Sequence, residues 1–116
     1  MSSTALEIAE SRTGPVCVLA LSGRVDSSNS GELMIRLNEL ISTGEKHILV
    51  DLGSILYLTS AGFRVLLLAT KDAERNAACL VLCSLTAQVR ELFEIGGLLD
   101  AFTVHPSRAD ALAQFG

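Results

Sequence analysis

The chain has 116 residues, of which 49% are hydrophobic but only 4% are aromatic, and its formal net charge is −4 at pH 7. This length predicts one domain over residues 1–116, with an aliphatic core large enough to fold without disulfides or structural metal. The nine Lys and Arg residues form no cluster, which argues against nucleic-acid binding, and no apolar run approaches the roughly 20 residues of a membrane-spanning helix.

The N-terminal segment MSSTALEIAESRTGPV has no basic region followed by an apolar one. We therefore expect no signal peptide and a cytoplasmic protein without direct insertion into a membrane. Cys17, Cys79 and Cys83 lie in apolar surroundings and are expected to be small buried residues in a reducing compartment. With two His and no Cys-x-x-Cys pair, neither a metal site nor a cofactor is expected.

The first half of the chain contains two strand candidates and one helix. Residues 5–9, ALEIA, form a weak strand candidate that the turn residues SRTGP end. Residues 16–21, VCVLAL, are apolar without alternation, which is typical of a strand covered on both faces. The following SGRVDSSNSG is expected to supply loop and cap residues. Apolar residues at near-helical spacing then predict a helix over residues 30–42, with Gly44 just past its end.

The second half continues the alternation of strands and helices. The predicted elements are a buried strand at 47–52, a helix from Ser60 to about Asn76, a buried strand at 79–83, a helix at 86–95, a strand at 102–104 and a helix at 107–115 capped by Ser107. In the helix at 86–95, we expect Val89, Leu92, Phe93 and Ile95 to point inward. The whole pattern predicts an α/β fold: a mixed, mostly parallel sheet of about five strands, with an antiparallel N-terminal hairpin at its edge, covered by about four helices.

Small residues, Thr59-Ser60-Ala61-Gly62, interrupt an apolar run where the second helix begins. The plainer interpretation is that Ser60 caps the helix by accepting a hydrogen bond from a free N–H group. The functional interpretation is that small residues keep the helix N-terminus bare, so that the hydroxyl is accessible and a phosphate on it meets unpaired N–H donors. Gly62 costs up to about 1 kcal/mol relative to Ala in a helix, which suggests a close approach there or tight packing on a strand.

Other polar residues form weaker candidate sites. The sequence does not favour Ser60 as a catalytic nucleophile, because no Gly-x-Ser-x-Gly turn surrounds it. A suitably placed base is also missing, since His47 and His105 resemble strand-end residues. GRVDSSNSG matches neither common glycine-rich phosphate loop, and its Asp26 and Ser28 equally suit a turn. Asp51, at the end of a predicted strand, could face a ligand crevice or simply terminate the strand.

Four segments together resemble the STAS domain family, and specifically its anti-sigma factor antagonists. They are VLALSGRVD, HILVDLGSILYLTSAGFRVLL, CLVLCSL and TAQVRELFEIGGLLDAFTV. The central segment, a strand ending in Asp-Leu followed by an aromatic residue and a Ser before a small residue and Gly, is the most specific match. The Val-x-x-Leu-Phe-x-x-x-Gly-Leu pattern from Val89 to Leu98 is a second one.

The resemblance implies the STAS fold and a binding protein rather than an enzyme. Its implied partners are an anti-sigma factor with a histidine-kinase-like ATPase domain, which phosphorylates a serine and is thereby released, and a serine phosphatase that resets the system. The phosphorylated residue carried over by position is Ser60, with Thr59 as second choice. The implied partner-binding residues are Asp26, Ser28, Thr59, Ser60, Gly62, Phe63 and Arg64.

Two residues depart from the family pattern: Thr59 stands where the best-studied members have Asp, and Arg64 where they often have Gly. An alternative interpretation is a STAS subunit of a lipid or anion transporter, which shares the fold without the phosphorylation switch. An enzyme or nucleotide hydrolase is a third interpretation, and it is disfavoured because the polar residues do not converge on any pair of base and nucleophile.

Overall fold

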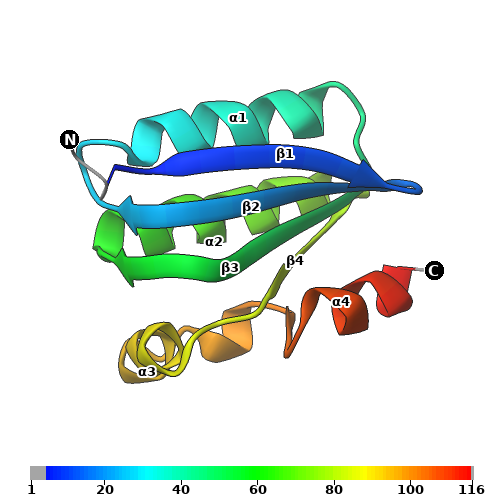
Figure 1. Ribbon diagram of the computed structural model, residues 1–116. Coiled ribbons are helices and arrows are strands. Elements are labelled where there is room, and N and C mark those ends of the chain that lie inside the picture. The colour runs from blue at the N-terminus through cyan, green and yellow to red at the C-terminus, as the bar shows by residue number, and fades with distance from the viewer. Residues whose placement is uncertain (1–4, 116) are drawn as a thin grey trace.

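The computed structural model describes residues 5–115, so residues 1–4 and 116 of the predicted domain lie outside this range. Strands alternate with helices along most of the chain (Figure 1). The elements are β1 (Glu7–Thr13), β2 (Val16–Val25), α1 (Ser30–Ser42), β3 (His47–Leu58), α2 (Ser60–Arg75), β4 (Cys79–Cys83), α3 (Ala87–Ile95), a short 3-10 helix (Leu99–Ala101), β5 (Val104–His105) and α4 (Arg108–Phe115).

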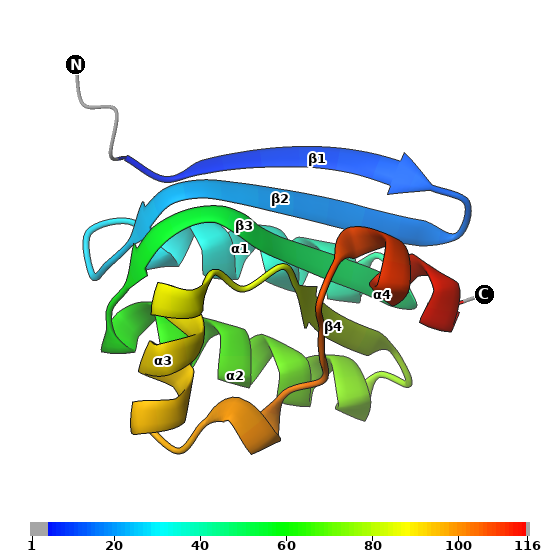
Figure 2. The same ribbon diagram turned by 60° about the horizontal axis from the view of Figure 1, so that its bottom comes forward.

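The five strands form one sheet in the order β1-β2-β3-β4-β5. β1 pairs with β2 antiparallel, and the remaining pairings are parallel. Parallel neighbours need crossover connections, and α1 and α2 supply two of them on one face of the sheet (Figures 1 and 2). The predicted mixed sheet with an N-terminal edge hairpin and four helices is confirmed.

The continuous apolar runs of the central strands are explained by two core layers. Successive side chains of a strand point to opposite faces, so Leu19 and Val50 join the layer beneath α1 and α2, whereas Val18 and Leu49 join the layer beneath α4. Both faces of β2 and β3 are therefore covered in this part of the sheet, as predicted. Within residues 5–115, no helix combines the length and apolar content needed to cross a membrane.

Three strands extend beyond their predicted ends. β1 continues through SRT to Thr13, and β2 continues through SGRV to Val25. Both extensions were predicted to be turn or loop residues. β3 runs six residues further than predicted, and its buried residues Leu52, Ile55 and Leu58 are spaced three apart. Register shifts between β2 and β3 produce this spacing, because a bulge moves later side chains onto the other face. Simple alternation therefore fails here.

Asp51 has a structural role on the face covered by α4. Its Oδ2 accepts a hydrogen bond from Arg108 Nε at 2.9 Å, and its Oδ1 accepts one from the backbone N–H of Gly53 at 2.8 Å. Because Arg108 begins α4, this ion pair ties the last helix to β3. The carboxylate is in the strand rather than at its end, so the prediction that Asp51 terminates the strand is wrong.

The cysteines differ in exposure. Cys17 and Cys83 are buried, whereas Cys79 is exposed at the start of β4. Burial is the main cause that raises the pKa of both the Cys17 and Cys83 thiols. The prediction of three buried cysteines is therefore wrong for Cys79. Its position as the first strand residue leaves its side chain outside both core layers.

Candidate functional site

The second helix begins with an exposed serine. Ser60 is the first residue of α2, and Thr59 before it has an extended backbone with φ −90° and ψ 177°. The carbonyl oxygen of Val25 accepts hydrogen bonds from the Thr59 hydroxyl at 3.2 Å and from the Thr59 N–H at 3.0 Å. Within residues 5–115, the Ser60 hydroxyl has no hydrogen-bond partner, and the side chain is exposed. The interpretation of Ser60 as the helix cap is therefore wrong, because Thr59 occupies the N-cap position and Ser60 is the first residue of the helix.

Gly62 is required by tight packing beneath the start of α2. A Cβ atom at this position would lie 2.7 Å from Leu58 Cδ2 and 3.0 and 3.1 Å from Val25 Cγ1 and Cβ. Both neighbours are almost completely buried, so neither has free space into which to move. Of the two explanations suggested by the sequence, the structure favours packing on the strands. Gly62 is itself buried, so it presents no side chain at the surface.

The N-terminal end of α2 carries no compensating negative charge from its own first turn. By contrast, α1 has Glu32 in its first turn. The unpaired N–H groups and aligned peptide dipoles of a helix start carry a partial positive charge that stabilises an added anion. A phosphate on the Ser60 hydroxyl would therefore be tolerated by the helix that bears it.

An apolar groove of about 560 Å³ lies beside Ser60. Its apolar lining combines residues before and within α2 with residues at the end of α3, two segments that lie side by side in Figure 2. These residues are Tyr57, Leu58, Phe63 and Leu67 on one side and Leu92, Ile95 and Leu98 on the other. Beneath the groove, the rings of Phe63 and Phe93 meet edge to face with centroids 4.8 Å apart. Among the described residues that line the groove, Arg64 alone carries a charge.

The wall of the groove that α3 supplies was not predicted from the sequence. Ile95 was expected to point inward, but its side chain is 77% exposed, so that prediction is wrong. Val89 and Phe93, four residues apart, occupy the buried face of α3. At 100° per residue, Ile95 lies well away from that face. The helical spacing of Ile95 relative to Val89 was the available signal.

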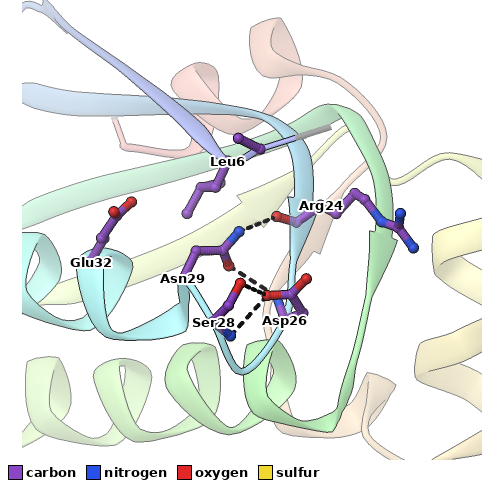
Figure 3. A pocket seen from close by; sticks show the side chains of 7 residues that line it. Leu6, Arg24, Asp26, Ser28, Asn29 and Glu32 are labelled. Carbon is purple, nitrogen blue, oxygen red and sulfur yellow. Dashed lines mark hydrogen bonds between the residues drawn. The ribbon is translucent and has the colours of Figure 1, made fainter. Parts of the chain in front are cut away.

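The loop after β2 lies close to the start of α2, because Val25 immediately before it is hydrogen-bonded to Thr59. Asp26 Oδ1 accepts hydrogen bonds from the Ser28 hydroxyl at 2.5 Å and from the Ser28 N–H at 2.9 Å (Figure 3). Asn29 Oδ1 accepts from the Asp26 N–H, while Asn29 Nδ2 donates to the Arg24 carbonyl oxygen. These bonds order the loop, and those from the Ser28 hydroxyl and N–H lower the pKa of Asp26.

The structure brings the residues implied by the resemblance to one end of the sheet, where β2 and β3 finish. Ser28, Ser60 and Arg64 are exposed, Asp26, Thr59 and Phe63 are half-buried, and Gly62 is buried. Two depressions result: a polar one beside the Asp26 loop (Figure 3) and the apolar groove beside Ser60. Among the described residues, this surface combines an apolar groove with aromatic residues, an exposed hydroxyl and one arginine, features that suit contact with another protein.

Comparisons with known proteins agree with a small α/β domain of this fold. The family model described as the STAS domain matches residues 7–111. The Bordetella bronchiseptica protein BtrV, named as a candidate anti-sigma factor antagonist, is 42% identical over 84% of this chain and 84% of its own length. The chain belongs to the STAS domain family.

Solved structures show the same fold at lower sequence identity. An anti-sigma factor antagonist from Mycobacterium paratuberculosis matches with a TM-score of 0.87 and 18% identity, covering 97% of this chain and 96% of that one. The Bacillus cell fate determinant SpoIIAA in its phosphorylated form matches with a TM-score of 0.72 and 18% identity. The match covers 97% of this chain and 100% of that one. At these identities the likeness concerns the fold.

Proposed function

We propose that this protein is an anti-sigma factor antagonist, a cytoplasmic binding protein rather than an enzyme, whose binding is ended by phosphorylation of Ser60. The observation that carries the proposal is the free, exposed Ser60 hydroxyl at the first position of α2, beside an open apolar groove. The name of its 42% identical relative supports the choice of partner, an anti-sigma factor. The kinase activity of that partner and a resetting phosphatase are further parts of the proposal.

In the phosphorylation step, Ser60 Oγ attacks the γ-phosphorus of ATP bound to the partner. A new Oγ–P bond forms, the bond between the γ-phosphorus and ADP breaks, and the hydroxyl proton passes to a base of the kinase. Ser60 suits this reaction because its hydroxyl has no partner within residues 5–115 that must first be displaced. The Thr59 hydroxyl is half-buried and bonded to Val25, which makes it the weaker candidate.

The phosphate acts on the interface more than on the fold. It adds about −1.5 to −2 charges to a helix start that tolerates negative charge. Against a carboxylate of the partner about 4 Å away, one such charge costs roughly 4 kcal/mol at an intermediate dielectric before screening by salt. At about 1.4 kcal/mol per tenfold change, the affinity falls by up to two to three powers of ten.

The test begins with affinity capture of the partner from the native host, identified by mass spectrometry. The captured anti-sigma factor is then tested for binding to the wild type, Ser60→Ala, Ser60→Asp and Thr59→Ala, with and without ATP. We expect Ser60→Ala to bind and resist phosphorylation, Ser60→Asp to lose most of its affinity, and Thr59→Ala to be phosphorylated at Ser60.

Ser11→Asp is a matched control, because Ser11 is also exposed but lies far from Ser60. Ser11 is in β1 and pairs with Val18 near the start of β2, whereas Ser60 lies near the end of β2. This variant should bind like the wild type. Normal binding by Ser60→Asp, together with an unmodified Ser60 after incubation with ATP, would contradict the proposal. Capture of membrane ATPase subunits instead of an anti-sigma factor would favour the transporter alternative.

A further inference from the structure

Arg64 is distinguished from most other arginines by its lack of an ion pair. Within residues 5–115, five arginines pair with a carboxylate: Arg12, Arg36, Arg75, Arg90 and Arg108. With the described residues Arg64 forms no such pair; it is exposed and lies between Phe63 and Leu67 at the apolar groove. A free guanidinium at the margin of an apolar surface is suited to pair with an acidic group that arrives from outside.

The spacing of Ser60 and Arg64 places them on one face of α2. Residues four apart on a helix have Cβ atoms about 5–6 Å from each other, and a negative group N-terminal to a positive one is the favourable order. Both residues line the same groove. The guanidinium fork matches the oxygens of a phosphate and forms short charge-assisted hydrogen bonds with it. A phosphate on Ser60 would therefore lie within reach of Arg64, one helical turn away.

We propose that Arg64 transmits the phosphorylation state of Ser60: its side chain pairs with a carboxylate of the anti-sigma factor while Ser60 is unmodified, and the phosphate withdraws it from that pair. This inference rests on the proposed function. The occupant of the groove is accordingly an apolar segment of the anti-sigma factor that carries an acidic residue. Phosphorylation then has two effects on this segment, since it adds repulsion and removes an attraction.

The charge of the groove shows the size of the change. Arg64 gives the described lining a charge of +1, because no other residue that lines it is charged. Adding about −1.5 to −2 charges leaves a net charge of roughly −0.5 to −1. The surface that attracted an acidic segment thus becomes one that repels it. A Gly at position 64 has no charge to withdraw from the partner, so phosphorylation would then act only by repelling the acidic segment.

The pair between the phosphate and Arg64 can be tested without any partner. Phosphoserine is incorporated at position 60 during translation, and the second pKa of its phosphate is followed by phosphorus NMR. A nearby cation favours the dianion and lowers this pKa. We expect the pKa of the wild type to lie about 0.2–0.4 units below that of Arg64→Gln, with Arg64→Lys between them.

Arg75→Gln is the control, because Arg75 is an exposed arginine at the other end of α2. It should titrate like the wild type. Thermal melting of each variant verifies that the helix is intact. Equal pKa values in the wild type and Arg64→Gln would overturn the proposed pair, whether or not Ser60 is a natural phosphorylation site.

The effect on binding is measured with the captured anti-sigma factor. Unphosphorylated Arg64→Gln should bind about tenfold more weakly than the wild type, the loss expected for a charge pair at an interface. Phosphorylation should weaken binding in both proteins. The factor by which the affinity falls should be about ten times smaller in Arg64→Gln than in the wild type. An equal reduction in both proteins would overturn the role of Arg64 and leave the proposed function standing. No reduction in the wild type would instead contradict the proposed function.

Discussion

Replacing Gly62 with Ala adds one methyl group where the start of α2 meets the ends of β2 and β3. The new Cβ would lie 2.7 Å from Leu58 Cδ2 and 3.1 Å from Val25 Cβ, both closer than ordinary contact. Leu58 and Val25 are 1% and 0% exposed, so they cannot turn out of the way. Val25 is also branched at Cβ and held by the bonds of its carbonyl oxygen to Thr59. The first turn of α2 must therefore move outward.

Two opposing terms determine the size of the effect. Ala in place of Gly favours a helix by up to about 1 kcal/mol. Overpacking a buried contact costs about 1–3 kcal/mol, and the closeness of the backbone-proximal Val25 Cβ places Gly62 in the upper part of this range. We therefore expect Gly62→Ala to lower the free energy of unfolding by about 1–2 kcal/mol, which corresponds to a decrease of about 3–10 °C in Tm.

Gly31 provides a matched control, because it lies in the first turn of α1 and a Cβ there would have no atom within 4 Å. Gly31→Ala should leave stability unchanged or raise it by up to about 1 kcal/mol. Urea unfolding and thermal melting, followed by circular dichroism, measure both variants. The packing argument is refuted if Gly62→Ala is at least as stable as the wild type. Movement of the helix start predicts, in addition, slower phosphorylation of Ser60 in Gly62→Ala.

Arg36 donates two hydrogen bonds of 2.7 Å to the Glu10 carboxylate, and these bonds are the main cause that lowers the pKa of Glu10. Their contribution to the free energy of unfolding is therefore present above about pH 4.5. It is lost as the pH falls through the lower pKa of the folded state. Arg36→Gln should raise the pKa of Glu10 in an NMR titration, and an unchanged value would contradict the role of these bonds. Maleimide should label Cys79 in the native protein much faster than Cys17 or Cys83, because those two thiols are buried and burial raises their pKa. Mass spectrometry identifies the labelled residue, and comparable labelling at all three would show that the core opens readily.

Local pattern was sufficient to predict most elements of the fold. The boundaries of α1 and β4 were predicted correctly, because a helical repeat between polar caps and a short apolar run are properties of neighbouring residues. The start of α2 at Ser60 was correct for the same reason. The far halves of β2 and β3 were not predicted, because bulges there change the period of the buried residues. A bulge depends on the pairing of two strands, which one segment does not record.

The sequence by itself determined the alternation of strands and helices, the aliphatic core and the small residues at the start of α2, because each follows from composition or local spacing. The tertiary structure decided which of these residues face solvent. Among residues 5–115 it gave the Ser60 hydroxyl no hydrogen-bond partner, and it exposed Ile95 at the groove that Tyr57 also lines. The physical reason is that periodicity specifies which face of an element is apolar, whereas exposure depends on which distant elements pack against that face.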